Sequence, residues 1–125
     1  MTAQILLIEE QPNQRLLYGQ ELEDEGYDVI ATGSGTEGLT LFQKHRPKLV
    51  ILDILLRGIT GIEVMERMLE LDPNVAIIVH SAYSSPSHDF VTWFAKAYVV
   101  KSGDLAELKH QVKLALAPTP GLVPA

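Results

Sequence analysis

Several residue types and patterns are scarce or absent in this chain of 125 residues, and each absence removes a class of function. There is no cysteine, which excludes disulfides, zinc–thiolate sites and thiol nucleophiles. No run of basic residues occurs and the formal net charge is -6, so a nucleic-acid surface is not expected. No apolar run reaches membrane-spanning length, and the N-terminus lacks a signal-peptide pattern. We therefore expect a soluble cytoplasmic domain with no membrane partner.

The composition that remains is that of a single globular domain. Hydrophobic residues make up 46% of the chain and charged residues 21%, which is typical of a folded protein rather than a disordered one. The length is sufficient to bury a core. We predict one domain over residues 1–117, followed by a loosely held proline-rich tail at 118–125.

Short apolar runs alternate with helical patterns. The runs predict strands at 5–8, 27–32, 48–53, 75–81 and 97–100. Helices are predicted from Pro12 to about Gly26, and over 34–45, 60–71, 88–95 and 104–116. The starts of three of them have capping-box spacing, in the sequences SGTE (34–37), TGIE (60–63) and DLAE (104–107). The apolar face of the first helix is assigned to Leu16, Leu17, Tyr18 and Leu22.

This alternation predicts an α/β fold with a doubly wound, five-stranded parallel sheet and helices on both faces. Ligands of such sheets bind beyond the carboxyl ends of the strands. Polar residues fall at those ends: Glu9 and Glu10 follow the first strand, Asp53 the third, Ser81 the fourth and Lys101 the fifth. We expect these side chains to meet at one edge, where the acids would bind a cation.

The pieces LLIEE, LVILDILLRG, IIVHSAY and AYVVKS, in this order and on successive strand ends, resemble the receiver domain of bacterial response regulators over about residues 4–116. The resemblance implies a CheY-like, flavodoxin-like sheet of order 2-1-3-4-5. It also implies a phosphoprotein of a two-component system that takes a phosphoryl group from a histidine kinase or a phosphotransfer protein and switches binding to a downstream protein. Such a domain catalyses only its own phosphorylation and dephosphorylation.

The resemblance also implies the residues of a magnesium site. Asp53 would be the phosphoacceptor and, with Glu10 and the backbone carbonyl of Leu55, a ligand of Mg²⁺, while Glu9 would act through water. A cation is needed because two carboxylates about 4 Å apart repel by roughly 4 kcal/mol at an effective dielectric constant of 20. The bridging charge also allows a carboxylate to approach an anionic phosphoryl donor.

Three further residues match the family. Lys101 would pair with Asp53 and then with the phosphoryl oxygens, and Ser81 would hydrogen-bond the phosphoryl group. Tyr98 matches the aromatic residue that moves with that hydroxyl during switching, although an ordinary strand residue is an equal interpretation. His80 is expected to be either a packed residue or an edge residue beside the site.

The chain departs from the family pattern at several positions. Both acids after the first strand are glutamate, and the extra methylene of Glu10 is expected to weaken a Mg²⁺ site that favours near-ideal octahedral geometry. Arg57 stands where the family has proline. Ser102 replaces the proline after Lys101, so the peptide between these two residues is predicted to be trans.

Two other function classes stay open on the sequence. One is a pseudo-receiver, a protein-binding module that keeps the fold without phosphorylation. The glutamate pair and the altered 81–101 segment favour it, and the intact Asp53, Ser81 and Lys101 oppose it. The other is a phosphatase or a flavin carrier of similar fold. The first would need an acid at Leu55, and the second a hydroxyl- and glycine-rich loop in place of EEQPNQ (9–14). The kinase, the target, the oligomeric state and any further domain stay undetermined.

Overall fold

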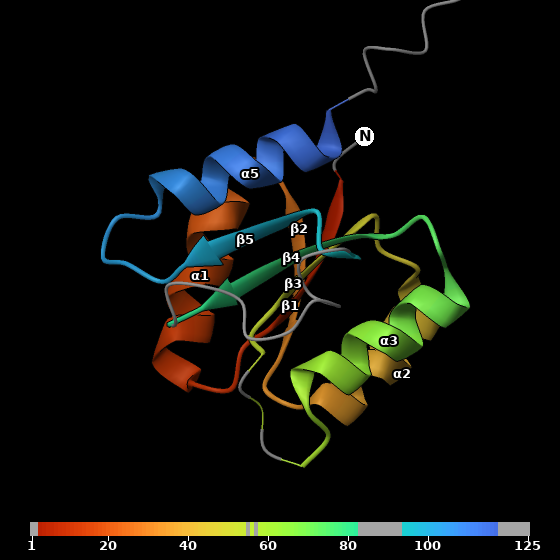
Figure 1. Ribbon diagram of the computed structural model, residues 1–125. Helices are drawn as coiled ribbons and strands as arrows, with labels where there is room; N and C mark the ends of the chain where they lie inside the picture. Colours follow the sequence, from red (N-terminus) through yellow and green to blue (C-terminus); the bar gives the residue numbers. More distant parts are fainter. Residues whose placement is uncertain (1–2, 55, 57, 83–93, 118–125) are drawn as a thin grey trace, which may run out of the picture.

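The computed structural model describes residues 3–54, 56, 58–82 and 94–117. Along the chain the elements are β1 (Gln4–Ile8), α1 (Pro12–Asp24), β2 (Asp28–Thr32), α2 (Gly35–His45), β3 (Leu49–Leu52), α3 (Gly61–Leu71), β4 (Ala76–Ser81), β5 (Ala97–Val100) and α5 (Ala106–Leu116), as drawn in Figure 1. Most of the helix predicted at 88–95, and the tail at 118–125, lie outside the described residues.

The five strands form one parallel sheet in the order β2-β1-β3-β4-β5, as the resemblance predicted. β1 lies between β2 and β3, with Ile8 opposite both Thr32 and Leu52. The chain reverses direction across the sheet at β1, because β2 is added on one side and every later strand on the other. The carboxyl ends of β1 and β3 therefore lie side by side at the point where a doubly wound sheet binds its ligands.

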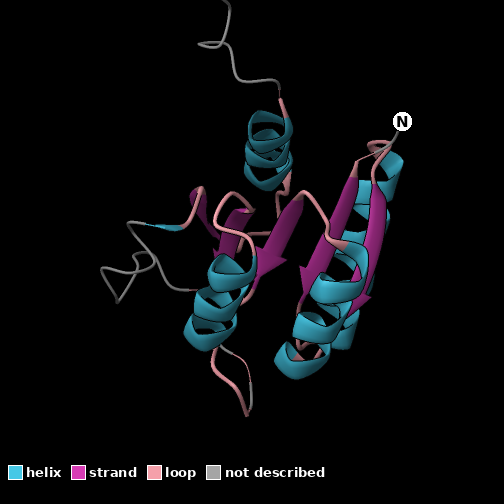
Figure 2. Cartoon of the chain, turned by 90° about the vertical axis from the view of Figure 1, so that its right-hand side faces the viewer, coloured by secondary structure: helices cyan, strands magenta, loops and turns pink. Residues whose placement is uncertain are grey.

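Helices cover both faces of the sheet, with α2 and α3 on one face and α1 and α5 on the other (Figures 1 and 2). The two faces carry separate apolar clusters, and successive residues of each buried strand alternate between them. Leu6 and Ile8 pack with Phe42 of α2 on one face, while Ile5 and Leu7 pack on the other. This two-sided burial explains why β1 and β3 read as unbroken apolar runs in the sequence.

The starts of α2 and α3 follow the predicted caps. Ser34 Oγ accepts a hydrogen bond from the backbone N of Glu37 at 3.1 Å, and Thr60 Oγ1 accepts one from that of Glu63 at 3.1 Å. Each bond satisfies an amide that has no partner within the helix. The sequence therefore places both helix starts correctly.

The last helix begins later than predicted, and its N-cap is not Asp104. α5 starts at Ala106 with Leu105 in the cap position, and Asp104 Oδ1 accepts from the backbone N of Ala106 at 2.9 Å. The difference arises because Ser102 forms a turn of its own: its Oγ accepts from the backbone N of Asp104 and donates to that residue's carbonyl. No described peptide is cis, so the Lys101–Ser102 bond is trans, as predicted.

The buried face of α1 differs from the prediction. Leu16 is 61% exposed and Leu17 50% exposed, whereas Tyr18, Gly19 and Leu22 are buried. Residues advance by about 100° around a helix, so a face centred on Tyr18 and Leu22 turns Leu16 to the opposite side. Two exposed leucines are therefore left on the outer side of α1.

Candidate functional site

The backbone brings the polar strand ends together. The amide of Asp53 donates to the carbonyl of Ile8 at 3.0 Å, which continues the β1–β3 pairing one residue past the strands. On the other side, the amide of Lys101 donates to the carbonyl of Ser81 at 2.7 Å. The sheet hydrogen bonds thus fix the relative positions of the residues that follow β1, β3 and β5.

The ammonium of Lys101 lies at the centre of the site. Its Nζ is 2.7 Å from Glu9 Oε1, 2.8 Å from Asp53 Oδ2 and 3.1 Å from Gln14 Oε1. The side chains of Glu9 and Asp53 are 2% and 8% exposed, and that of Lys101 is 14% exposed. Two largely buried carboxylates therefore share one cation, which offsets their mutual repulsion.

The surroundings of Lys101 keep it charged. Burial acts to lower the pKa of Lys101, but its hydrogen bonds to Asp53 and Glu9, together with the charges of those two groups, outweigh burial and raise the pKa above its ordinary value. The ammonium form is therefore the one present at neutral pH. A permanent positive charge next to Asp53 suits an anionic reaction partner.

The two adjacent glutamates have different surroundings. Glu9 is 1% exposed, and its Oε2 accepts a hydrogen bond from the backbone N of Gln11 at 3.1 Å. Glu10 is half-buried. The sequence assigned Glu9 to the metal through water and did not anticipate its ion pair with Lys101. Glu9, the more buried of the two glutamates, is therefore the counter-charge of Lys101.

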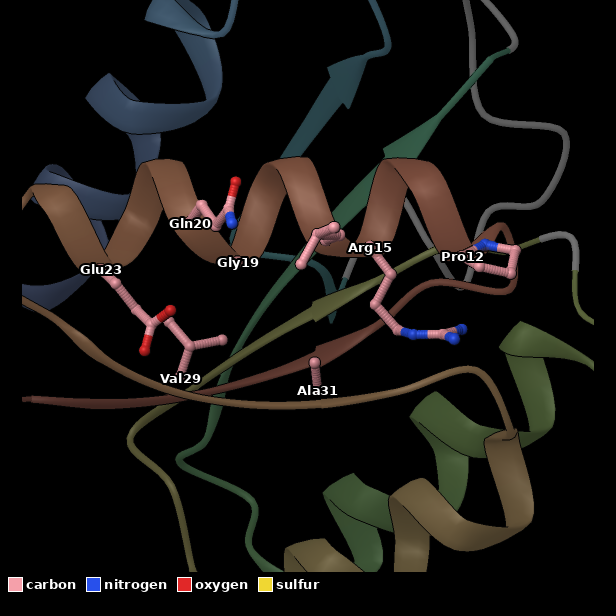
Figure 3. A pocket seen from close by; sticks show the side chains of 8 residues that line it. Pro12, Arg15, Gly19, Gln20, Glu23, Val29 and Ala31 are labelled. Carbon is pink, nitrogen blue, oxygen red and sulfur yellow. The ribbon is translucent and has the colours of Figure 1, made fainter.

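Arg15 holds the backbone that carries both glutamates. Its Nη1 donates to the carbonyl of Glu9 at 2.8 Å and lies 3.3 Å from the carbonyl of Glu10. Figure 3 shows this side chain leaving α1 beside a cavity of about 350 Å³ between α1 and β2, which is lined by Pro12, Arg15, Leu16, Gly19, Gln20, Glu23, Val29 and Ala31. The cavity contains no residue that was predicted for the site, but Arg15 lines it and also contacts the backbone of Glu9 and Glu10.

The described residues supply two candidate carboxylates for a magnesium ion, Asp53 and Glu10. Within the described ranges, no group of three or more His, Cys, Asp or Glu side chains is placed so that it could hold a metal ion. Mg²⁺ is commonly bound by one or two carboxylates and keeps several waters, so the donor chemistry fits. Leu55, whose carbonyl was predicted as a further ligand, lies outside the described residues.

Ser81 and Tyr98 lie on the two strands beyond β3. Ser81 is fully buried at the end of β4, where it pairs in register with Val100. Tyr98 pairs in register with Val79 and is half-buried against the cluster on the α2–α3 face. The part of each residue in switching stays a prediction.

His80 packs between the sheet and α1. It is 2% exposed, and its ring meets that of Tyr18 edge to face with 4.8 Å between the centroids. Its buried Nδ1 has no hydrogen-bond partner among the described residues. Burial, aided by the charge of Lys101, lowers the pKa of His80 to about 4, so the imidazole is neutral at physiological pH. Of the two positions expected from the sequence, the packed one is confirmed.

Comparison with known proteins decides the family. The family model described as the response regulator receiver domain matches residues 5–113. The chain belongs to this family. Among the curated relatives of this receiver domain, sporulation initiation phosphotransferase F of Bacillus subtilis is 32% identical over 120 residues, covering 90% of this chain and 93% of that protein. The DNA-binding response regulator MtrA of Mycolicibacterium smegmatis is 33% identical over 119 residues.

The receiver domain spans 51% of the length of that MtrA, so it corresponds to about half of this relative. Among solved structures, the response regulator TrrA of Thermotoga maritima, in complex with Mg²⁺ and BeF, is 39% identical with a TM-score of 0.87, covering 92% of this chain and all of that one. TrrA in complex with the histidine kinase ThkA gives a TM-score of 0.85 at the same identity. None of the described helices has the length and apolar character needed to span a membrane.

Two residues of the site were missed by the sequence analysis. Gln14 and Arg15 lie in the first turns of α1 and contact the cluster from that helix, whereas the predicted cluster was drawn from the ends of strands. Pro12 at the start of α1 marks where the helix begins, and a helix that starts directly after Glu10 must pass the site. This spacing is the one signal that could have directed attention to them.

Proposed function

We propose that this receiver domain takes a phosphoryl group onto Asp53 from a histidine kinase or a phosphotransfer protein, and that the modified domain changes its binding to a downstream protein. The observation that carries the proposal is the ammonium of Lys101 held 2.8 Å from Asp53 Oδ2, at an edge of the sheet where Asp53 is only 7% exposed. The complexes of TrrA with a kinase and with Mg²⁺ and BeF support it.

The proposed step is a nucleophilic displacement at phosphorus. A carboxylate oxygen of Asp53 forms a bond to phosphorus, while the bond from phosphorus to the donor breaks and the leaving group keeps the electron pair. Lys101 neutralises part of the charge on the phosphoryl oxygens as they approach two carboxylates. Because the sheet fixes the backbone of Asp53 and Lys101, the two residues are already in position and the strands need not rearrange for the reaction.

The residues that would hold Mg²⁺ are Asp53, Glu10 and the carbonyl of Leu55, with Glu9 acting through water. When bound, the ion would supply positive charge that offsets the negative charge of the carboxylates and the phosphoryl group. The domain would catalyse only its own phosphorylation and dephosphorylation and turn over no other substrate.

The test is incubation of the protein with acetyl phosphate and magnesium, followed by intact-mass measurement and peptide mapping. We expect the addition of one phosphoryl group, mapped to Asp53, and its loss in Asp53→Asn. Asp24→Asn, an exposed acid at the end of α1, is the matched control and should be modified as the native protein is. Label on any other residue, or label that survives Asp53→Asn, would refute the assignment.

A second candidate is the pseudo-receiver, a binding module that does not depend on phosphorylation. The observation that favours it is the ion pair of Glu9 with Lys101, which gives Glu9 a side-chain counter-charge in place of a metal ion. This alternative predicts no mass change with acetyl phosphate and no response to magnesium. The same experiment therefore separates the two functions.

A further inference from the structure

The ammonium of Lys101 has as many acceptors around it as it has hydrogens to donate. A lysine ammonium has three N–H donors and no acceptor. Glu9, Asp53 and Gln14 each place one oxygen between 2.7 and 3.1 Å from Nζ. A phosphoryl oxygen that is to receive a hydrogen bond from Lys101 must therefore displace one of these three.

The three acceptors are not equivalent. Glu9 and Asp53 are carboxylates at 2.7 and 2.8 Å, while Gln14 offers a neutral amide oxygen at 3.1 Å. The bonds to Glu9 and Asp53 also gain the attraction between two full charges, which the neutral amide oxygen of Gln14 does not supply. Gln14 is also half-buried, so water can replace Lys101 as its partner more easily than at Glu9, which is 1% exposed. While the donor approaches and Asp53 is still a carboxylate, the bond to Gln14 is the one that breaks at least cost.

From this geometry we infer that Gln14 is a positioning residue: it holds the third N–H of Lys101 in the unphosphorylated domain and releases it to the incoming phosphoryl group. This inference rests on the proposed function, since the release occurs when Asp53 is modified. Gln14 lies in the first turn of α1, so the same bond joins the helix to the loop after β5. Phosphorylation would then loosen a contact between α1 and the site.

Two substitutions at position 14 should act in opposite directions. Gln14→Leu keeps a similar size but removes the acceptor, which leaves one N–H of Lys101 available. It should speed modification by acetyl phosphate about three- to fivefold, the effect of one hydrogen bond whose loss water partly compensates at this half-buried position. Gln14→Glu replaces the amide with a carboxylate that holds Lys101 more strongly, so modification should slow by about tenfold or more.

Two other substitutions on α1 serve as controls. Asn13→Glu is the control for Gln14→Glu, because it adds the same negative charge one residue away at an exposed position. Gln20→Leu is the control for Gln14→Leu, because it places the same apolar side chain at an exposed position of the same helix. Both should react within about twofold of the native rate. They separate the contact with Lys101 from general repulsion of the donor and from altered helix stability.

The contact itself is tested without phosphorylation by a double-mutant cycle on unfolding in urea, with Gln14→Leu, Lys101→Met and the double variant. We expect a coupling of about fivefold in the unfolding equilibrium constant. Absence of coupling in the urea experiment would overturn the inference. In the rate experiment, it would be overturned if both variants at Gln14 reacted more slowly than the native protein, or if both reacted at the rate of the controls.

The failure of the inference can be told apart from the failure of the proposed function. If the native protein takes no phosphoryl group, the proposed function falls and the release step falls with it, whatever the urea cycle shows. If the native protein is modified on Asp53 but the two variants at Gln14 do not diverge, the proposed function stands and the role of Gln14 alone is refuted.

Discussion

The buried imidazole of His80 makes the stability of this domain depend on pH in a specific range. The pKa of His80 is lowered from 6.5 to about 4 by burial first and by the charge of Lys101 second, with Asp53 acting in the opposite direction. The unfolded chain restores the ordinary value. Between these two values the unfolded state binds more protons than the folded state, so stability falls as the pH is lowered from about 6.5 toward 4.

The size of the effect follows from the two pKa values. At about pH 5.5, histidine in the unfolded chain is about nine-tenths protonated while His80 in the folded domain stays neutral, which lowers the free energy of unfolding by about 1.4 kcal/mol. At about pH 7.5 the same contribution is below about 0.1 kcal/mol. His80 is 2% exposed, so solvent screening does not reduce this figure appreciably.

The assay is urea unfolding of the native protein and of His80→Leu at the two pH values. The difference between the two proteins isolates the contribution of His80. We expect the native protein to lose about 1.3 kcal/mol more than the variant between about pH 7.5 and 5.5. Equal losses in the two proteins would show that His80 titrates normally in the folded domain and would refute the reasoning.

Two further predictions concern the surroundings of the acceptor. Glu10→Asp should bind magnesium more tightly than the native protein, because a shorter ligand suits octahedral geometry, and a calorimetric magnesium titration at fixed ionic strength that gives equal affinities would contradict this. Gly61→Ala should lower the free energy of unfolding by about 1–3 kcal/mol, because the added methyl group would meet the backbone of Ile54 at 2.5 Å and the carbonyl of Asp53 at 2.9 Å. Gly19→Ala is the control for urea unfolding: its methyl group would meet nothing within 4 Å and should not destabilise the fold.

The strands and their order were predictable because burial on both faces leaves a distinct pattern. β1, β3 and β4 are almost entirely apolar, and each predicted strand agrees with the structure to within one residue at either end. A charged or hydroxyl residue directly after such a run must lie at the edge of the sheet. The grouping of Asp53 and Lys101, 48 residues apart, followed from that rule together with the family resemblance.

The parts that escaped prediction depend on side-chain direction. The sequence does not distinguish the side-chain directions of the two neighbouring glutamates, yet it is Glu9 that points inward and pairs with Lys101. The leucines of α1 fit two helix faces equally well, and only the packing of Tyr18 against His80 shows which face is buried. Gln14 is 87 residues from its partner, and a lone glutamine carries no pattern that points to a lysine so far along the chain.

The position of β1 between β2 and β3 has a consequence for the order in which the chain can assemble. β2-β1-β3 is complete once residue 52 is available, whereas β4 and β5 can only be added outward from β3. In chain order the cation of the site comes last, because Lys101 follows β5 while Glu9 and Asp53 follow β1 and β3. Until β5 docks, Glu9 and Asp53 lack the buried cation that they share. Docking of this last strand therefore completes the sheet and also brings Lys101 to the two carboxylates.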